Sequence, residues 1–350
     1  MNVHKMSITE KVGQLFMVGF EGARPTGEVI NLISTYKVGG LCYVTENYRN
    51  PRQIHRLSKK LQAYAHKELP LFLSVYQEGG EYNCFSKGVI QGPDQSTLGI
   101  VNNRLYTKQM AEMVAEELRA LGINMNISPS LTINNDHKNS FGDSIDLVAN
   151  HGVAAIQGYQ KKNVTAVAKY FPVPIDSSVE RLLMKSYDMP HSTLYPFFKV
   201  IQKDVDAILV SDSMIPNTNI ENPALFTHSI IQSFVRNELN YNGLLIKEIH
   251  EQETVDEIAA AAITAIQSGV DLICLTKPYK IQIAVIDAVM DAIKEGLIPV
   301  QRLNESVERI LSLKEKRKVG RMEPFNQDIF EKKRAVRFIH KLEEMAVSRT

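Results

Sequence analysis

Eight short apolar segments, separated by longer stretches with helical periodicity, constrain the fold of this 350-residue chain more than any other feature. All eight have the length of strands, and most are continuous apolar runs, as in strands buried on both faces. The segments are QLFMVGF (14–20), VGGLCYV (38–44), LFLSVYQ (71–77), INMNISP (123–129), VTAVAKYFP (164–172), AILVSDS (207–213), GLLIKEI (243–249) and DLICLT (271–276).

Most of the stretches between these segments have the period of an amphipathic helix. In RLYTKQMAEMVAEELRALG (104–122), for example, Met110, Val114 and Leu118 share one face and Gly122 provides a stop. Strands that alternate with helices predict an α/β fold with a parallel sheet, and eight such units predict a closed (β/α)8 TIM-type barrel. An open doubly wound sheet would give similar local patterns, but no G-x-G-x-x-G motif follows the first segment, which weakens its dinucleotide-binding version.

The segment after the eighth strand predicts a C-terminal helical extension. IPVQRLNESVERILSLKEKRK (298–318) has a helical pattern, VGRMEPFN (319–326) breaks it, and a mixed-charge helix follows over about 327–347. We therefore expect a barrel domain over 1–320 and a helical tail over 321–350. The tail is expected to pack on the chain's own barrel, with docking to a partner as the alternative.

Charge and cysteine usage narrow the partners and the compartment. A formal net charge of +1 gives no reason to expect nucleic acid or an anionic membrane as partner. No apolar run approaches the ~18 residues of a membrane span, and the N-terminus lacks an apolar signal region. Three cysteines without C-x-x-C spacing favour a reducing, cytoplasmic location. No cofactor is expected, and Asp136, His137 and Asp212 lack the spacing of a metal site.

In a barrel of this kind the functional groups lie at the C-terminal ends of the strands. The residues in those places are 76–78, 128–136, 169–176, 211–213 and 247–250. Candidate ligand-binding residues among them are Tyr76, Glu78, Lys169, Tyr170, Asp176, Asp212 and His250.

These segments carry a resemblance to a known family. Over residues 8–315 the chain resembles the N-terminal barrel domain of glycoside hydrolase family 3, and within it the bacterial β-N-acetylhexosaminidases that trim cell-wall sugars. The matching stretches are VGQLFMVGFEG (12–22), VGGL (38–41), QEGG (77–80), ALGINMNISPSL (120–131), SFGD (140–143), KYFP (169–172), LYPF (194–197), NPALFTHSIIQSFVRNELNYNGLLI (222–246) and GLIPVQRLNESVERILSLK (296–314).

The resemblance implies a retaining glycosidase, in which a carboxylate attacks the anomeric carbon and a proton donor assists the leaving oxygen. The family's nucleophile is the first Asp of an I-[ST]-D-D motif on the seventh strand. Here that motif reads Ile246, Lys247, Glu248 and Ile249, so the candidate nucleophile is Glu248. Glu is one methylene longer than Asp, and a displacement of ~1 Å can cost ~100-fold in rate.

The family's proton donor is a His held by an Asp on the loop K-H-F-P-G-H-G-D-T-x-x-D-S-H. This chain reads KYFPVPIDSSVERL over 169–182. Asp176 is retained, but Tyr170 replaces a sugar-binding His, Glu180 stands for the Asp of the dyad and Leu182 stands for the catalytic His. Loss of a general acid typically removes ~10²–10⁴ in rate.

Other positions of the family's sugar site also differ. Tyr76 stands where an Asp would hold sugar hydroxyls, and Glu81 and Asn139 each replace an Arg. The A-H pair that ends the sixth strand reads Ser211 and Asp212. These changes beside a retained framework are typical of relaxed selection on glycosidase chemistry.

Several of these residues have two interpretations. Glu248 is either a nucleophile or the partner of Lys247 or Lys169 in a buried ion pair. His250 and His137 are either replacement acids or solvated histidines. Lys169 is expected to point into the pocket and to be paired there. Glu78 and Asp212 either complete a polar network at the barrel mouth or bind a ligand.

Three functions follow from these readings. The first is a non-catalytic scaffold that binds carbohydrate, of the N-acetylhexosamine or muropeptide type, or a protein. The second is an active retaining glycoside hydrolase of altered specificity that uses Glu248 as nucleophile. The third is a barrel enzyme of different chemistry, built on Lys169, Lys247, Asp212 and Glu248, in which a desolvated Lys acts as base or nucleophile.

Overall fold

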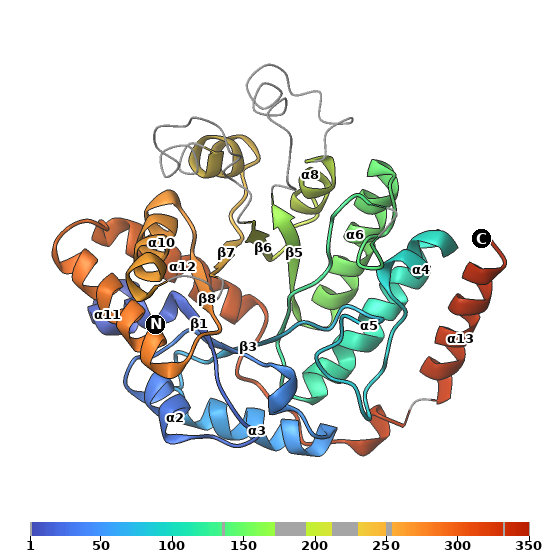
Figure 1. Cartoon of the computed structure of the whole chain (residues 1–350), viewed down its shortest axis with the longest axis horizontal. Coiled ribbons are helices and arrows are strands. Elements are labelled where there is room, and N and C mark those ends of the chain that lie inside the picture. Colours follow the sequence, from blue (N-terminus) through green and yellow to red (C-terminus); the bar gives the residue numbers. More distant parts are fainter. Residues whose placement is uncertain are drawn as a thin grey trace. The chain divides into compact units, whose positions relative to one another are not determined.

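The computed structural model describes residues 2–134, 137–171, 194–211, 230–249, 254–331 and 333–349. Eight parallel strands close into a barrel in the order of the sequence (Figure 1). The strands are β1 (Phe16–Gly19), β2 (Gly40–Cys42), β3 (Phe72–Val75), β4 (Met125–Asn126), β5 (Thr165–Phe171), β6 (Ala207–Val210), β7 (Leu244–Glu248) and β8 (Leu272–Leu275). All eight predicted strands and the closed TIM-type barrel are therefore confirmed.

Helices follow the strands along the chain. Those of the first half are α1 (Ile8–Gln14), α2 (Gly27–Ser34), α3 (Pro51–Tyr64), α4 (Gln95–Val101), α5 (Arg104–Ala120) and α6 (Ile145–Lys161). Those of the second half are α8 (Tyr195–Ile201), a π-helix (Ile230–Glu238), α10 (Val255–Ser268), α11 (Tyr279–Lys294), α12 (Val300–Lys316) and α13 (Lys333–Val347). Short 3-10 turns lie at Val3–Lys5, Thr45–Asn47 and Gln327–Ile329. Among the described helices, none combines the length and apolar character that a bilayer crossing requires.

Local sequence signals explain where several helices begin and end. Ser7 and Glu10 form a capping box at α1, and Thr254 and Glu257 form another at α10. Gly269 ends α10 in the left-handed conformation, with φ of 116°. Capping of this kind satisfies backbone groups that a helix terminus otherwise leaves open.

The chain divides into two compact units. The first contains Met1–Val75, Leu121–Asn124 and Asn222–Glu323, and the second contains Tyr76–Ala120, Met125–Glu221 and Pro324–Thr350. In the first unit, β1, β2, β3 and β8 are buried along their whole length. Gly40 allows close packing there, because a Cβ on it would lie 2.8 Å from the carbonyl oxygen of Phe72 on the neighbouring strand.

A buried cluster of arginines fixes the start of β8 in the first unit. The Asp271 carboxylate, which is fully buried, accepts a bond of 2.6 Å from Arg236, one of 3.2 Å from Arg302 and one of 3.0 Å from Arg309. The backbone NH of Leu245 also donates to it, at 3.0 Å. The carboxylate is thus saturated and ties β7, β8, α12 and the π-helix together.

A buried lysine lies in the same unit. Lys314, on α12, donates to Gln14 Oε1 at 2.7 Å and lies 5.1 Å from the centre of the Phe72 ring. Burial lowers the pKa of Lys314 from 10.5 to about 7. This lysine has no ion-pair partner among the described residues, so its charge is costly to keep.

In the second unit, α5 packs beside α6 and α6 packs beside α8 (Figure 1). The C-terminal α13 packs on α4, burying Ala335, Leu342 and Ala346. Lys341 donates to the hydroxyl of Tyr106 on α5 at 3.0 Å. The predicted tail helix is confirmed as α13, and it packs on helices of its own chain. The division at residue 320 stays a prediction.

Candidate functional site

A buried ion pair joins two residues of the second unit. Lys169, on β5, donates from Nζ to Glu78 Oε1 at 2.6 Å, and Glu78 follows β3 in the sequence. The two side chains are only 2% and 3% exposed. The lysine that the sequence predicted to be paired is thus paired, and its partner is Glu78.

Two tyrosine rings enclose the same ammonium group. Lys169 Nζ lies 4.8 Å from the centre of the Tyr76 ring and 5.0 Å from the centre of the Tyr170 ring. Both distances lie within the range of cation–π attraction. Tyr170 itself is 38% exposed, whereas Lys169 is buried. One face of this assembly is therefore open to solvent, and the charges lie beneath it.

Burial governs the ionisation of Glu78. Removal from water raises the pKa of its carboxyl above the ordinary value, although the ammonium of Lys169 opposes that change. Oε2 accepts no hydrogen bond from the described residues. The Asn139 side chain also favours the charged form of Glu78. Glu78 thus has one satisfied and one unsatisfied oxygen.

A polar framework holds the backbone that carries Glu78. The NH of Gln77 donates to Asn126 Oδ1 at 2.9 Å, and Asn126 Nδ2 donates to the Gln77 carbonyl at 2.8 Å. The Gln77 amide makes a second reciprocal pair with the backbone of Phe85, at 3.0 and 3.1 Å. Sequence reasoning missed the role of Asn126, although its place beside Gln77 at the end of a neighbouring predicted strand was a usable signal.

β7, in the first compact unit, ends in two charged residues. Lys247 and Glu248 are the last two residues of β7 and are half-buried. Glu248 is in register with Cys274 on β8. The pKa of the Cys274 thiol is raised well above its ordinary range by a hydrogen bond with Cys42, by burial, and in part by the charge of Glu248. Glu248 therefore lies near the buried thiols of Cys42 and Cys274.

The structure brings Tyr76, Glu78, Lys169 and Tyr170 together in one unit. The remaining predicted site residues, Asp176, Asp212 and His250, lie outside the described residues, as do Glu180 and Leu182. Within the described residues, no three His, Cys, Asp or Glu side chains come together in a way that would hold a metal ion.

The glycosyl hydrolase family 3 N-terminal domain matches residues 7–313 of this sequence. The chain belongs to this family. The matched region thus includes Glu78, Lys169 and the end of β7, and it excludes α13.

Relatives of this family 3 chain include the beta-hexosaminidase A of Pseudoalteromonas piscicida, 24% identical over 89% of this chain. The match spans 61% of that protein, so the chain corresponds to less than two thirds of it. The beta-hexosaminidase of Nitrosomonas eutropha is 27% identical over 68% of this chain and 73% of its own length.

Among solved structures, a family 3 beta-N-acetylglucosaminidase from Paenibacillus sp. str. FPU-7 is similar to this chain, with a TM-score of 0.85 and 30% identity. The match covers 97% of this chain and 69% of that one. The beta-N-acetylhexosaminidase of Beutenbergia cavernae, at 20% identity and a TM-score of 0.74, shares the fold. This family 3 chain is thus similar to hexosaminidases in sequence and in backbone.

Proposed function

We propose that this family 3 hexosaminidase-like chain binds carbohydrate that contains N-acetylhexosamine and does not hydrolyse it efficiently. The observation that carries the proposal is the pairing of Lys169 with Glu78 beneath Tyr76 and Tyr170. The ammonium and the carboxylate pair with each other, and neither side chain is more than 3% exposed. A buried pair whose two charges hold each other is poorly placed to transfer protons to a substrate.

The sequence supports the loss of hydrolysis. By resemblance, the proton donor of the family is a His at the position of Leu182, and Leu has no proton to donate. The nucleophile position holds Glu248, one methylene longer than the family's Asp, next to Lys247. A retaining glycosidase needs both groups, so the change at position 182 alone removes a large part of the rate.

The tyrosines support the retention of binding. Tyr170 presents an aromatic side chain, 38% exposed, at the end of β5, where ligands of barrel proteins bind. An aromatic face combines apolar area with a polar tip and is well suited to a sugar ring. The named hexosaminidase relatives give the substrate class. A cytoplasmic location is part of this proposal and rests on the three cysteines of the sequence.

One observation favours the alternative of an active hydrolase. Glu248 is the last residue of β7 and is half-buried, so a carboxylate is retained at the end of the strand that carries the family's nucleophile. A protein partner in place of a sugar is the other alternative, and the exposed tyrosine suits it equally.

Binding and product analysis of one ligand test the proposal. Chitobiose, the disaccharide of N-acetylglucosamine, is titrated into the full chain by calorimetry, and the recovered sugar is analysed by chromatography. We expect binding, recovery of intact disaccharide, and affinity about fivefold weaker in Tyr170→Ala, since an aromatic contact contributes about 1 kcal/mol. Tyr64→Ala, at a tyrosine 43% exposed on α3, is the matched control. Cleavage of the disaccharide, or no binding at all, would contradict the proposal.

A further inference from the structure

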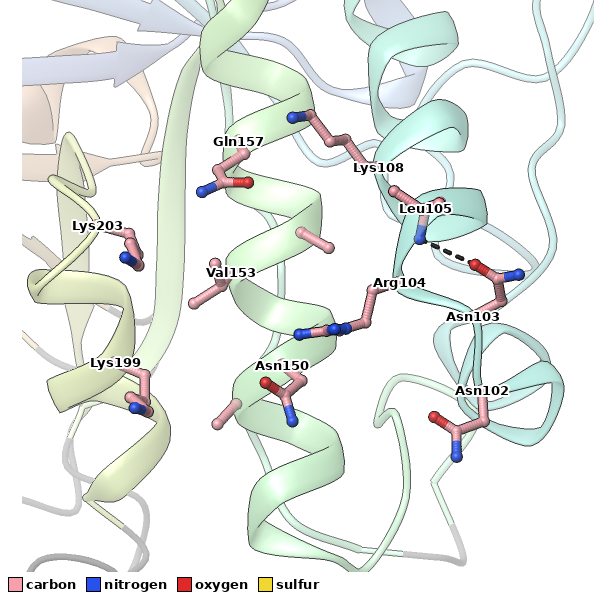
Figure 2. Close-up of a pocket in the computed structure, with 12 residues that line it drawn as sticks. Asn102, Asn103, Arg104, Leu105, Lys108, Asn150, Val153, Gln157, Lys199 and Lys203 are labelled. Atoms are coloured by element: carbon pink, nitrogen blue, oxygen red, sulfur yellow. Dashed lines mark hydrogen bonds between the residues drawn. The ribbon is translucent and has the colours of Figure 1, made fainter.

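A hollow lies on the outer helices of the second unit, and none of its described lining residues belongs to the site described above. It lies between α5, α6 and α8 and has a volume of about 600 Å³ (Figure 2). Small-molecule sites typically measure about 300–1,000 Å³. The hollow is therefore large enough for an oligosaccharide of a few residues.

Four cationic side chains line this hollow on two opposite walls. Arg104 and Lys108 are one turn apart on α5, whereas Lys199 lies on α8 and Lys203 follows that helix (Figure 2). No acidic residue is among the lining residues within the described part of the chain. None of the four cations forms an ion pair with a residue that the structure describes. Cations of like sign around one hollow repel each other and create a positive potential that attracts anions.

The floor of the hollow, on α6, combines the amides of Asn150 and Gln157 with the apolar side chains of Ala149, Val153 and Ala154. Asn150, Val153 and Gln157 follow one face of α6, at the spacing of successive helical turns (Figure 2). The amides of Asn150 and Gln157 offer both donors and acceptors, which suit hydroxyl and acetamido groups. None of the lining residues that the structure describes is aromatic, so they offer a nucleobase no ring to stack on.

The wall at the start of α5 is fixed by its own helix cap. Asn103 Oδ1 accepts from the backbone NH of Leu105 at 3.0 Å (Figure 2). This bond uses the Asn103 oxygen and orients the first turn of α5, from which Arg104 projects. Arg104 and Lys203 are exposed and therefore free of packing constraints.

We propose that this hollow binds an anionic oligosaccharide, with carboxylate or phosphate groups held by the two cationic walls and sugar hydroxyls held by the α6 amides. The cationic side chains select a ligand of negative charge. The amides, and the lack of aromatic rings among the described lining residues, favour a glycan over a nucleotide. This site goes beyond the proposed function, because it requires no residue at the strand ends.

Three probes test the inference on the full chain by calorimetry at low and at moderate salt. Tetragalacturonate carries carboxylates, maltotetraose 1-phosphate carries a phosphate, and chitotetraose is neutral. We expect at least one anionic probe to bind, with affinity that falls as salt rises. We expect Arg104→Gln/Lys203→Gln to weaken that binding about tenfold, because each charge-assisted contact contributes several-fold.

The controls separate this site from others. Lys59→Gln/Lys60→Gln removes two exposed lysines of α3 and should leave binding of the anionic probe unchanged. Binding of chitobiose should also be unchanged in Arg104→Gln/Lys203→Gln, so failure here is distinguishable from failure of the proposed function. Equal loss in both double variants, absence of binding by both anionic probes, or equal affinity for a poly-glutamate peptide would overturn the assignment.

Discussion

Removal of one partner of the Lys169–Glu78 pair should destabilise the barrel strongly. The two charged atoms are 2.6 Å apart and the side chains are 2% and 3% exposed. At an effective dielectric constant of ~20 their attraction is about 6 kcal/mol, part of which offsets their desolvation. In Lys169→Met, Glu78 is left buried without its cation. We expect a loss of about 3–5 kcal/mol in the free energy of unfolding at neutral pH.

The pH dependence of this variant has a defined sign. Burial already raises the pKa of Glu78, and Lys169 opposes that effect, so loss of the lysine raises the pKa further. A folded-state pKa above the unfolded one means that the folded state binds more protons. The stability of Lys169→Met should therefore increase relative to wild type as pH falls from 7 toward 5.

Urea denaturation of four proteins measures the effect: wild type, Lys169→Met, Glu78→Gln and the double variant. The double variant should lose less than the sum of the single losses, with a coupling of at least about 2 kcal/mol. Lys138→Met is the matched control, because Lys138 and Glu81 form an ion pair of 2.8 Å with side chains 58% and 75% exposed, and it should barely move the midpoint. A loss below about 1 kcal/mol in Lys169→Met, or strict additivity, would refute the buried pair.

Two further predictions concern the first unit. Lys314 has a pKa lowered by burial to about 7, so the unfolded state binds more protons between pH 7 and its ordinary 10.5. In wild type, the free energy of unfolding should rise by about 4 kcal/mol as pH rises over that range. In thermal melts, Lys314→Met should be more stable than wild type at pH 7 and should not show this rise. Burial alone would raise the pKa of Asp271, but the three arginines around it outweigh burial and hold that pKa below its ordinary range. In urea denaturation at neutral pH, Asp271→Asn should lose about 3–5 kcal/mol in the free energy of unfolding. The loss should be smaller at acidic pH, where the wild-type carboxylate also becomes protonated. An unchanged midpoint would contradict the stabilising role of the cluster.

The fold was predictable because burial leaves a repeated signal in the sequence. Most of the barrel strands are apolar on both faces, so all eight runs were visible, down to β4, where only Met125 and Asn126 form a regular strand. The stop at Gly122 and the break before α13 were visible for the same reason, since they interrupt helical periodicity.

The partners within the fold were less predictable. Glu78 and Lys169 are 91 residues apart, and periodicity places each at a strand end without saying which charges meet. The same holds for Asp271, which reads simply as the start of a strand, and for Arg104 and Lys203, which read as ordinary surface cations. Pair identities depend on side-chain packing, which the pattern of apolar residues does not specify.

The measurement that tests the central claim most directly is release of 4-nitrophenol from 4-nitrophenyl N-acetyl-β-glucosaminide by wild type and by Glu248→Gln. If the barrel has lost its proton donor and altered its nucleophile, the two proteins should release 4-nitrophenol at the same rate, indistinguishable from the buffer blank. Sustained turnover by wild type that disappears in Glu248→Gln would contradict the account.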